Sequence, residues 1–398
     1  MPVTIPFDLD RLRDPALLPI GEKLRVGERL SIADGVTLFR SPDLLGVGAM
    51  ADAANRARHG DRVTFASNQH INPTNVCVLR KTCVFCGYAR LPKEDGAYRY
   101  SLEQVLAESD RADGSITREF HIVGGLDMEA GLEYYQTMFR ALKARHPQVH
   151  IKALTAVEIA HIARIEKMSR KDVLIALREA GLDTLPGGGA ETFSAAVRDV
   201  IADKKLGGAE YIEVHRTAHQ LGIRSNCTML YGHVESLEDR MQHLNMLREL
   251  QDETGGFLAY IPLAYHPDDN ELGKTLGREG TATTGFDDLR NLAVGRLFLD
   301  NFEHIKSHWI MASTPVSQIS LHFGVNDIEG TVVREKIYHA VGAHTPQGMT
   351  LPQLLSLIRG AGKVPAERDS FYHVLREFAP DETGATDDST VPLAGVVG

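Results

Sequence analysis

The sequence predicts an α/β fold, a (β/α)₈ barrel of the TIM type with a helical extension before it and a flexible tail after it. Beyond Asp61, short apolar or β-branched runs alternate with longer amphipathic runs, which is the order of strands and helices in such folds. The alternation contains eight candidate strands. Hydrophobic residues make up 43% of the chain and charged residues 24%, as in ordinary globular proteins. Eight strands alternating with helices favour a closed barrel or an open version of it.

The chain divides into four predicted parts. Residues 1–60 form an N-terminal helical extension, in which Pro42–Arg58 carries apolar residues at helical spacing. The barrel spans residues 61–345, and a C-terminal helical segment follows over residues 346–378. Residues 379–398 are rich in Asp, Thr, Gly and Pro, which predicts a disordered tail.

The candidate strands are short, and helical patterns lie between them. The clearest helix runs from Leu237 to Leu250 with apolar residues at spacings of three and four, after Ser236 as N-cap. Two further helices are predicted over 130–145 and 286–302. The candidate strands are Gln69–Asn72, Glu119–Val123, His150–Ala153, Thr184–Pro186, Arg224–Met229, Phe257–Pro262, Ile305–Ile310 and Ile319–Leu321. Because barrel active sites lie at the C-terminal ends of strands, the segments after these strands carry the candidate functional residues.

Charge and hydropathy narrow the function classes. The net charge is −10 and the pI about 5.9, without a basic stripe, so a nucleic-acid partner is not expected. No apolar run is long enough to cross a membrane, and the N-terminal residues lack a signal-peptide pattern. We therefore expect a cytoplasmic protein that acts on a small molecule.

Cysteine usage indicates metal or redox chemistry. The chain has four cysteines, and Cys77, Cys83 and Cys86 fall within ten residues of one another, directly after the first candidate strand. Iron–sulfur carriers bind a cubane cluster through four cysteines. Three cysteines leave one iron open, as catalytic metal sites do, so that a substrate amine and carboxylate can bind it. Cys227 lies in an apolar run and is expected to be a packed, inert thiol.

Two other interpretations of the cysteines stay open at this point. A structural zinc site would use the three cysteines and a histidine such as His70. Alternatively, Cys83 and Cys86 would form a redox disulfide. The position after the first strand of a βα-barrel favours the iron–sulfur cluster.

Eight segments together resemble the radical S-adenosylmethionine (SAM) enzymes, and among them the aminodeoxyfutalosine synthase family of the futalosine route to menaquinone. These segments are His70–Cys77, His121–Gly125, Ile151–Glu158, Leu185–Glu191, Thr228–His233, Leu250–Gly256, Phe298–Asn301 and Gly324–Thr331. The resemblance covers roughly residues 60 to 370. The usual spacing in these enzymes is Cys-x₃-Cys-x₂-Cys, whereas residues 78–82 make the first gap five residues long here. We therefore expect an unusual cluster loop.

The resemblance implies a barrel of the radical SAM kind, a [4Fe–4S] cluster on Cys77, Cys83 and Cys86, and SAM as a consumed co-substrate. The cluster would donate one electron to SAM and release methionine and a 5′-deoxyadenosyl radical. The radical would add to the enolpyruvyl double bond of 3-[(1-carboxyvinyl)oxy]benzoate. Rearrangement and decarboxylation would give 6-amino-6-deoxyfutalosine. An electron donor such as flavodoxin or ferredoxin is implied.

Three residues near the cysteines and the second strand are expected to contact SAM. Gly124 and Gly125 lack a Cβ atom, so the backbone there can approach the methionine amine closely. The alternative is a simple tight turn. Phe85 is expected to place its backbone against the adenine, or else to be a packed aromatic residue.

Four further residues follow the third to fifth strands. Glu158 and Glu191 would bind ribose hydroxyls or the amine, or would instead be charges at helix N-termini. Met229 and Tyr231 would form walls of the adenine pocket, although Tyr231 also suits a core position.

The anionic substrate needs cationic or hydrogen-bond-donating partners, and six residues are candidates. They are His233, His266, Arg296, Asn326, Asp327 and Thr331. Arg296 lies in a helical pattern and would otherwise form a salt bridge, and Asn326 and Asp327 would otherwise close a turn. Radical addition needs little proton transfer, so we assign no catalytic residue beyond the cluster.

Two other functions remain as alternatives. A dehypoxanthine futalosine cyclase shares several of the same segments but would abstract hydrogen and release 5′-deoxyadenosine; a deazaflavin-type radical synthase is more distant. From another class, a zinc-stabilised barrel would bind ligands without radical chemistry.

Overall fold

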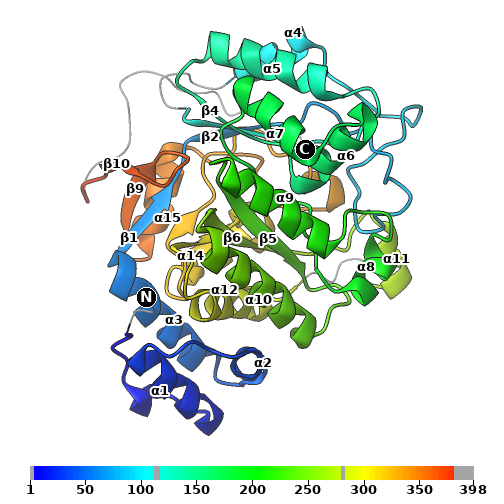
Figure 1. Ribbon diagram of the computed structural model, residues 1–398. Helices are drawn as coiled ribbons and strands as arrows, with labels where there is room; N and C mark the ends of the chain where they lie inside the picture. The colour runs from blue at the N-terminus through cyan, green and yellow to red at the C-terminus, as the bar shows by residue number, and fades with distance from the viewer. Residues whose placement is uncertain (1–3, 112–116, 279–282, 381–398) are drawn as a thin grey trace.

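The computed structural model describes residues 4–111, 117–278 and 283–380 (Figure 1). Its centre is a barrel of parallel strands, in agreement with the predicted fold class. The barrel strands are β1 (Arg62–Phe65), β2 (Asn68–Ile71), β3 (Glu119–Ile122), β4 (His150–Ala153), β5 (Ser225–Tyr231), β6 (Phe257–Ala264), β7 (His304–Ser307) and β8 (Asp327–Ile328).

Two seams close the barrel. Between β4 and β5, Thr184 pairs with Lys152 and Leu185 with Ser225. Residues 184–185 therefore fill the position of a strand between β4 and β5, where the sequence predicts the strand Thr184–Pro186. At the other seam the chain bends between β1, which pairs with β8, and β2, which pairs with β3. The Asn68 backbone N–H donates to Thr331 Oγ1 at 3.0 Å across this bend.

Helices cover the outside of the barrel, and side-chain caps fix where several of them begin. Thr155, Ser236 and Thr284 each accept from the third residue of a helix that follows, which satisfies a free backbone N–H there. The helices are α4 (Leu102–Ser109), α5 (Leu132–Arg145), α6 (Ala156–Glu166), α7 (Arg170–Glu179), α8 (Ala195–Ile201), α9 (Gly208–Gln220), α10 (Leu237–Thr254), α11 (Glu271–Leu276), α12 (Gly285–Phe298), α13 (Trp309–Ala312) and α14 (Thr314–Ser320).

The N-terminal extension is helical, as predicted, and lies at one end of the barrel (Figure 1). It contains the short turns Leu9–Arg11 and Pro15–Leu17 and the helices α1 (Leu18–Val26), α2 (Ile32–Arg40) and α3 (Leu44–His59). Glycines allow close packing here: a Cβ atom on Gly35 would lie 2.1 Å from Met241 Cε of α10. The extension therefore packs directly on the barrel helices.

One predicted strand was wrong, and one strand of the structure was not predicted. Residues Ile319–Leu321 lie at the C-terminal end of helix α14, whose N-terminus is set by the Ser313 cap and Pro315. The last barrel strand is β8 instead. Two residues are too few for a period-two pattern, so β8 leaves little signal in the sequence. The structure also adds β1, which the sequence reading did not assign.

The C-terminal segment is more than the predicted helical segment over residues 346–378. Helix α15 (Leu351–Gly360) is followed by β9 (Val364–Arg368) and β10 (Val374–Glu377), which form an antiparallel hairpin. Strand β9 pairs in parallel with β1 over four residue pairs and so extends the barrel sheet. The predicted tail lies, from residue 381 onward, outside the described residues.

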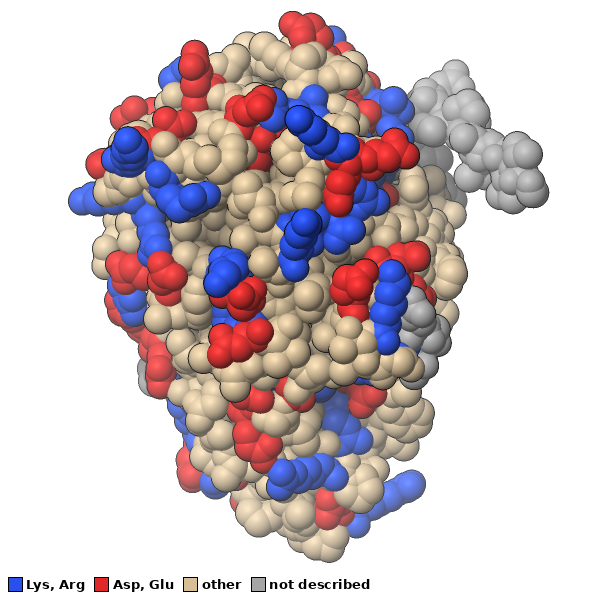
Figure 2. Space-filling view, turned by 90° about the vertical axis from the view of Figure 1, so that its right-hand side faces the viewer, with Lys and Arg blue, Asp and Glu red and all other residues tan. Residues whose placement is uncertain are grey.

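Charged residues of both signs lie on the surface of the molecule. Acidic and basic residues are interspersed on the face shown in Figure 2. Among the described residues, each helix is too short or too polar to cross a membrane.

Candidate active site

A cavity of about 290 Å³ opens at the C-terminal ends of the barrel strands, where barrel active sites lie. Three groups of residues line it: the loop that carries Cys77, Cys83 and Cys86, the strand ends, and a late segment that includes Tyr338 and Val341. The cavity therefore brings the predicted cluster ligands to the mouth of the barrel.

The cysteine loop is held by backbone hydrogen bonds to the barrel and its helices. The N–H of Val78 donates to Leu126 O at 3.0 Å, and that of Val84 to Ile201 O at 3.0 Å. The long gap between the first two cysteines forms a compact turn, in which the N–H groups of Thr82 and Cys83 both donate to Leu79 O at 2.9 Å. The two extra residues are thus absorbed locally.

The donor set and its surroundings fit an iron–sulfur cluster. All three donors are thiols on one loop, and an apolar shell that includes Leu79, Leu126 and Val157 surrounds them. Burial raises the pKa of Cys83 to about 12, and a bound metal would favour its thiolate form. Among the described residues, no three His, Cys, Asp or Glu side chains converge tightly enough for a single ion. A cubane cluster holds its thiolates farther apart than one ion does.

His70, the histidine of the zinc alternative, faces another part of the site. Its ring stacks on His121 with centroids 4.5 Å apart, on neighbouring strands inside the barrel. The structure therefore pairs His70 with a second histidine.

Gly124 and Gly125 border the cavity, but packing explains why both are glycines. A Cβ atom on Gly125 would lie 2.1 Å from Val76 O, and one on Gly124 would lie 2.7 Å from Thr74 O. The close approach is therefore to the segment that leads into the cysteine loop.

Glu158 combines a cap with a place at the cavity. Its carboxylate accepts from the N–H of Thr155 at 2.7 Å and of Gly124 at 3.0 Å, so it starts α6 and also fixes the end of β3. Burial raises the pKa of Glu158 to about 7. The carboxyl group is therefore close to its titration point near neutral pH.

Glu191 forms a buried ion pair that the sequence reading missed. Lys205 Nζ lies 2.5 Å from Glu191 Oε1 and 5.4 Å from the ring centroid of Phe85. Lys205, Glu191 and Phe85 all border the cavity beside the cysteines. Lys205 lies in an irregular segment after α8, where no periodic pattern could have singled it out.

Met229 and Tyr231 are placed away from the cavity, which corrects the prediction for both. Side chains alternate along β5, and Thr228 and Leu230 face the cavity, so Met229 and Tyr231 face the helices instead. Tyr231 donates its hydroxyl to Asp288 Oδ1 at 2.7 Å in the core.

Five of the six substrate candidates also lie elsewhere. His233 is buried in a turn, where its Nδ1 accepts from the Val234 N–H. Arg296 donates to backbone carbonyls and to Asn326 Oδ1, as a structural arginine. Asp327 pairs with Arg368 at 2.7 Å, and Thr331 joins the barrel seam. These residues complete buried backbone and charge networks, whereas His266 does border the cavity.

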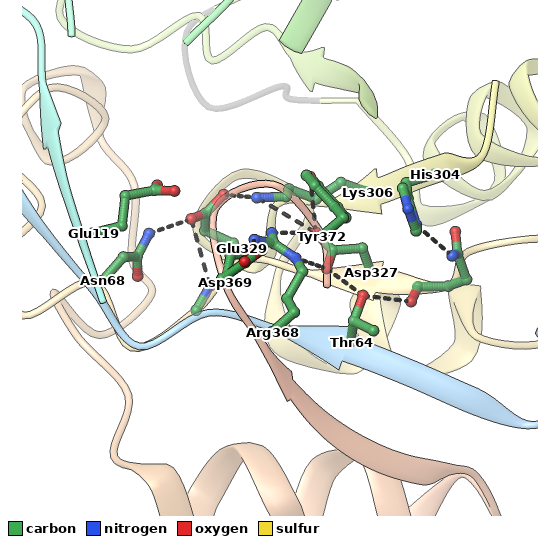
Figure 3. A network of polar contacts seen from close by, with 12 residues as sticks. Thr64, Asn68, Glu119, His304, Lys306, Asp327, Glu329, Arg368, Asp369 and Tyr372 are labelled. Atoms are coloured by element: carbon green, nitrogen blue, oxygen red, sulfur yellow. Dashed lines mark hydrogen bonds and ion pairs between the residues drawn. The ribbon is translucent and has the colours of Figure 1, made fainter. Parts of the chain in front are cut away.

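The deep part of the cavity is polar, and the sequence reading assigned it no role. His70, His121 and Lys152 are register partners across β2, β3 and β4, and all border the cavity. Lys152 Nζ lies 2.6 Å from Glu119 Oε2, and Lys306 Nζ lies 3.2 Å from Glu329 Oε2. Figure 3 shows how Lys306, Asp327 and Arg368 continue this network. The sequence signal for this polar region was the polar residue at an inward-facing position of each of these strands.

Known proteins resemble most of the chain. Residues 71–247 match the radical SAM superfamily, and residues 254–380 match the CofH/MqnC C-terminal region. An aminodeoxyfutalosine synthase of Thermus thermophilus is 45% identical over 366 residues, which cover 92% of this chain and 97% of that relative. One of Streptomyces coelicolor is 42% identical over 367 residues, 90% of this chain and 94% of the relative. A cyclic dehypoxanthine futalosine synthase of S. coelicolor is 36% identical over 366 residues, 90% of this chain and 89% of the relative.

Solved structures agree on the fold. The crystal structure of methylornithine synthase aligns with a TM-score of 0.69 at 17% identity, covering 87% of this chain and 97% of that chain. The X-ray structure of the FeFe-hydrogenase maturase HydG from Carboxydothermus hydrogenoformans aligns with a TM-score of 0.69 at 16% identity, covering 89% and 80%. The barrel, the cysteine loop and these matches together show that the chain belongs to the radical SAM superfamily, in the family of the aminodeoxyfutalosine synthases.

Proposed function

We propose that the protein catalyses the aminodeoxyfutalosine synthase reaction of menaquinone biosynthesis. The reaction joins the 5′-deoxyadenosyl group of SAM to 3-[(1-carboxyvinyl)oxy]benzoate and gives 6-amino-6-deoxyfutalosine, methionine and CO₂ or bicarbonate. The observation that carries this proposal is the identity of 45% and 42% to two such synthases over nearly the whole chain, against 36% to the cyclase.

Cys77, Cys83 and Cys86 would hold the [4Fe–4S] cluster that enzymes of this superfamily use. When bound, the cluster supplies the electron that cleaves SAM into methionine and a 5′-deoxyadenosyl radical. The apolar shell around the cysteines would keep water and oxygen away from this chemistry. A cytoplasmic flavodoxin or ferredoxin would supply the electron.

The residues beside the cysteines would bind SAM. Phe85, Glu158 and Glu191 border the cavity together with Gly124 and Gly125, which supports the SAM contacts predicted for them. Glu158 offers carboxylate oxygens to ribose hydroxyls or to the methionine amine, while its cap fixes it in place. The chain's main contribution is to orient SAM and the enolpyruvyl group toward each other.

A substrate comparison tests the proposed function. The protein would be purified without oxygen, reconstituted with iron and sulfide, reduced, and incubated with SAM. One sample would receive 3-[(1-carboxyvinyl)oxy]benzoate and the other dehypoxanthine futalosine, with products identified by mass spectrometry. We expect 6-amino-6-deoxyfutalosine from the first sample and no turnover in the second. Cyclisation in the second sample with release of 5′-deoxyadenosine would instead assign the cyclase function.

A further inference from the structure

Three histidines gather on the floor of the cavity, and neither the cluster nor the SAM site uses them. His70 on β2 and His121 on β3 are register partners with stacked rings. His308 follows β7 and interacts electrostatically with His70. All three border the cavity. Three imidazoles thus line one part of the barrel interior.

Two of these imidazoles have free nitrogen atoms. His70 Nε2 and His308 Nδ1 are buried and have no hydrogen-bond partner among the described residues. His70 as a whole is 9% exposed, so bulk water does not satisfy it. An unpartnered buried polar atom is costly, which points to a ligand that completes it.

The charged groups of the floor are already paired with one another. Lys152 pairs with Glu119, and Lys306 pairs with Glu329. Glu335, which also borders the cavity, accepts from His339 at 2.7 Å. The charges of these groups are thereby balanced, and the unpartnered imidazole nitrogens, as N–H groups, are donors that a ligand can engage without breaking an ion pair. Such donors suit a carboxylate, which only accepts hydrogen bonds.

The histidines also lie deeper in the barrel than the cysteines. His70 and His121 are within their strands, whereas Cys77 and Gly124 follow the ends of the same strands. The reacting carbon of the substrate must face SAM, on the cysteine side of the cavity. The part of the substrate farthest from that carbon is then directed to the histidines.

We propose that His70 and His308 bind the ring carboxylate of the aryl enolpyruvyl ether, and that His121 holds His70 in place by stacking. This inference rests on the proposed function. The histidine floor makes the site specific for a substrate with a second carboxylate on its ring, and it holds the enolpyruvyl end toward the cysteines.

Binding of two compounds by the reconstituted holoenzyme tests the assignment. One is 3-[(1-carboxyvinyl)oxy]benzoate and the other 2-phenoxyprop-2-enoate, which lacks the ring carboxylate; calorimetry gives both dissociation constants. We expect the wild type to prefer the benzoate by about 10- to 100-fold, since each hydrogen bond to a charged group contributes in that range. His70→Leu and His308→Leu each reduce this preference, and the conservative His308→Gln, which keeps an N–H donor, restores part of it.

His243→Leu is the matched control. His243 is also buried, and its Nδ1 has no hydrogen-bond partner among the described residues, but it does not line the cavity and its Nε2 is bonded to Thr228 O. It keeps the wild-type preference. A wild type without the preference, or Leu variants that retain it in full, overturns the inference. A wild type that binds the benzoate with this preference but forms no adenosyl product overturns the proposed function and leaves the carboxylate site standing.

Discussion

Cys83 and Cys227 are both buried thiols, yet their surroundings differ. Cys83 borders the cavity with two other cysteines, whereas Cys227 points into the core and its thiol contacts Ala259 O. We expect Cys83→Ala to lose bound iron and sulfide and to abolish SAM cleavage. Cys227→Ala should keep both and lose only about 1 kcal/mol of stability from the small cavity it creates.

Iron and sulfide analysis of the two reconstituted variants, followed by a SAM-cleavage assay, checks this prediction. Equal cluster content in the two variants would contradict the ligand assignment.

Glu158 predicts a pH dependence of stability. Burial raises the pKa of its carboxyl group from 4.5 to about 7, so the folded state holds a proton that the unfolded state releases. This contribution is present in full below pH 4.5 and is lost as the pH rises toward 7. Glu158→Gln cannot ionise. The free energy of unfolding of the wild type, relative to the variant, should therefore fall by about 3 kcal/mol from pH 4 to pH 8.

Urea denaturation of both apoproteins across this pH range measures the difference. A constant difference between the two would show that Glu158 does not titrate in that range.

At the residue scale, the sequence predicted a place at the cavity correctly for residues that follow a motif, and wrongly where the side-chain direction along a strand decides it. Cys77, Phe85 and Glu158 follow strand ends and do border the cavity. Met229 and Tyr231 follow the same logic, but β5 continues to Tyr231, and alternation turns both toward the helices. If the inward-facing positions of a strand are assigned one residue too early or too late, every side chain on it is placed on the wrong face.

At the scale of elements, β8 and β9 depend on a buried ion pair between them. Asp327 of β8 binds Arg368 of β9 through both carboxylate oxygens, at 2.7 and 2.8 Å (Figure 3). Asp327→Asn would leave Arg368 buried without its charge partner, so we expect a loss of about 3 to 5 kcal/mol of stability. The exposed pair of Arg62 with Glu377 provides the control, and Glu377→Gln should cost about 1 kcal/mol or less.

Chemical denaturation of the two variants checks this expectation, and the KM for the aryl substrate should stay near the wild-type value in both. A raised KM with unchanged stability in Asp327→Asn would return Asp327 to the substrate site.

The elements themselves were predictable to different degrees. β4 matches its predicted bounds, and β2, β3, β5 and β6 lie within two residues of theirs. Of these, β6 has the long apolar run that marks a buried strand. Strand β8 has two residues, and β9 begins with Val364-Pro365, so neither carries a period-two pattern. Both β8 and β9 form because β1 provides backbone hydrogen-bond partners on its two edges. The tertiary structure, not the local sequence, therefore decides that they are strands.

At the scale of the whole molecule, the barrel separates two environments along its axis. The cysteine loop and its apolar shell lie at the mouth, and a charge-balanced polar floor lies below. The sequence motifs pointed to the mouth, since loops after strands carry them. The floor is assembled from inward side chains of strands far apart in sequence, so closure of the barrel is needed before they meet.

In the proposed reaction, the 5′ carbon of the adenosyl group of SAM becomes part of the product. SAM labelled with ¹³C at its 5′ carbon, incubated with the reduced holoenzyme and 3-[(1-carboxyvinyl)oxy]benzoate, tests it most directly. We expect the label in one compound that also contains the aryl carboxylate, in an amount equal to the methionine released. Recovery of the label in free 5′-deoxyadenosine, with the benzoate unchanged or rearranged without it, would rule out the proposed synthase reaction.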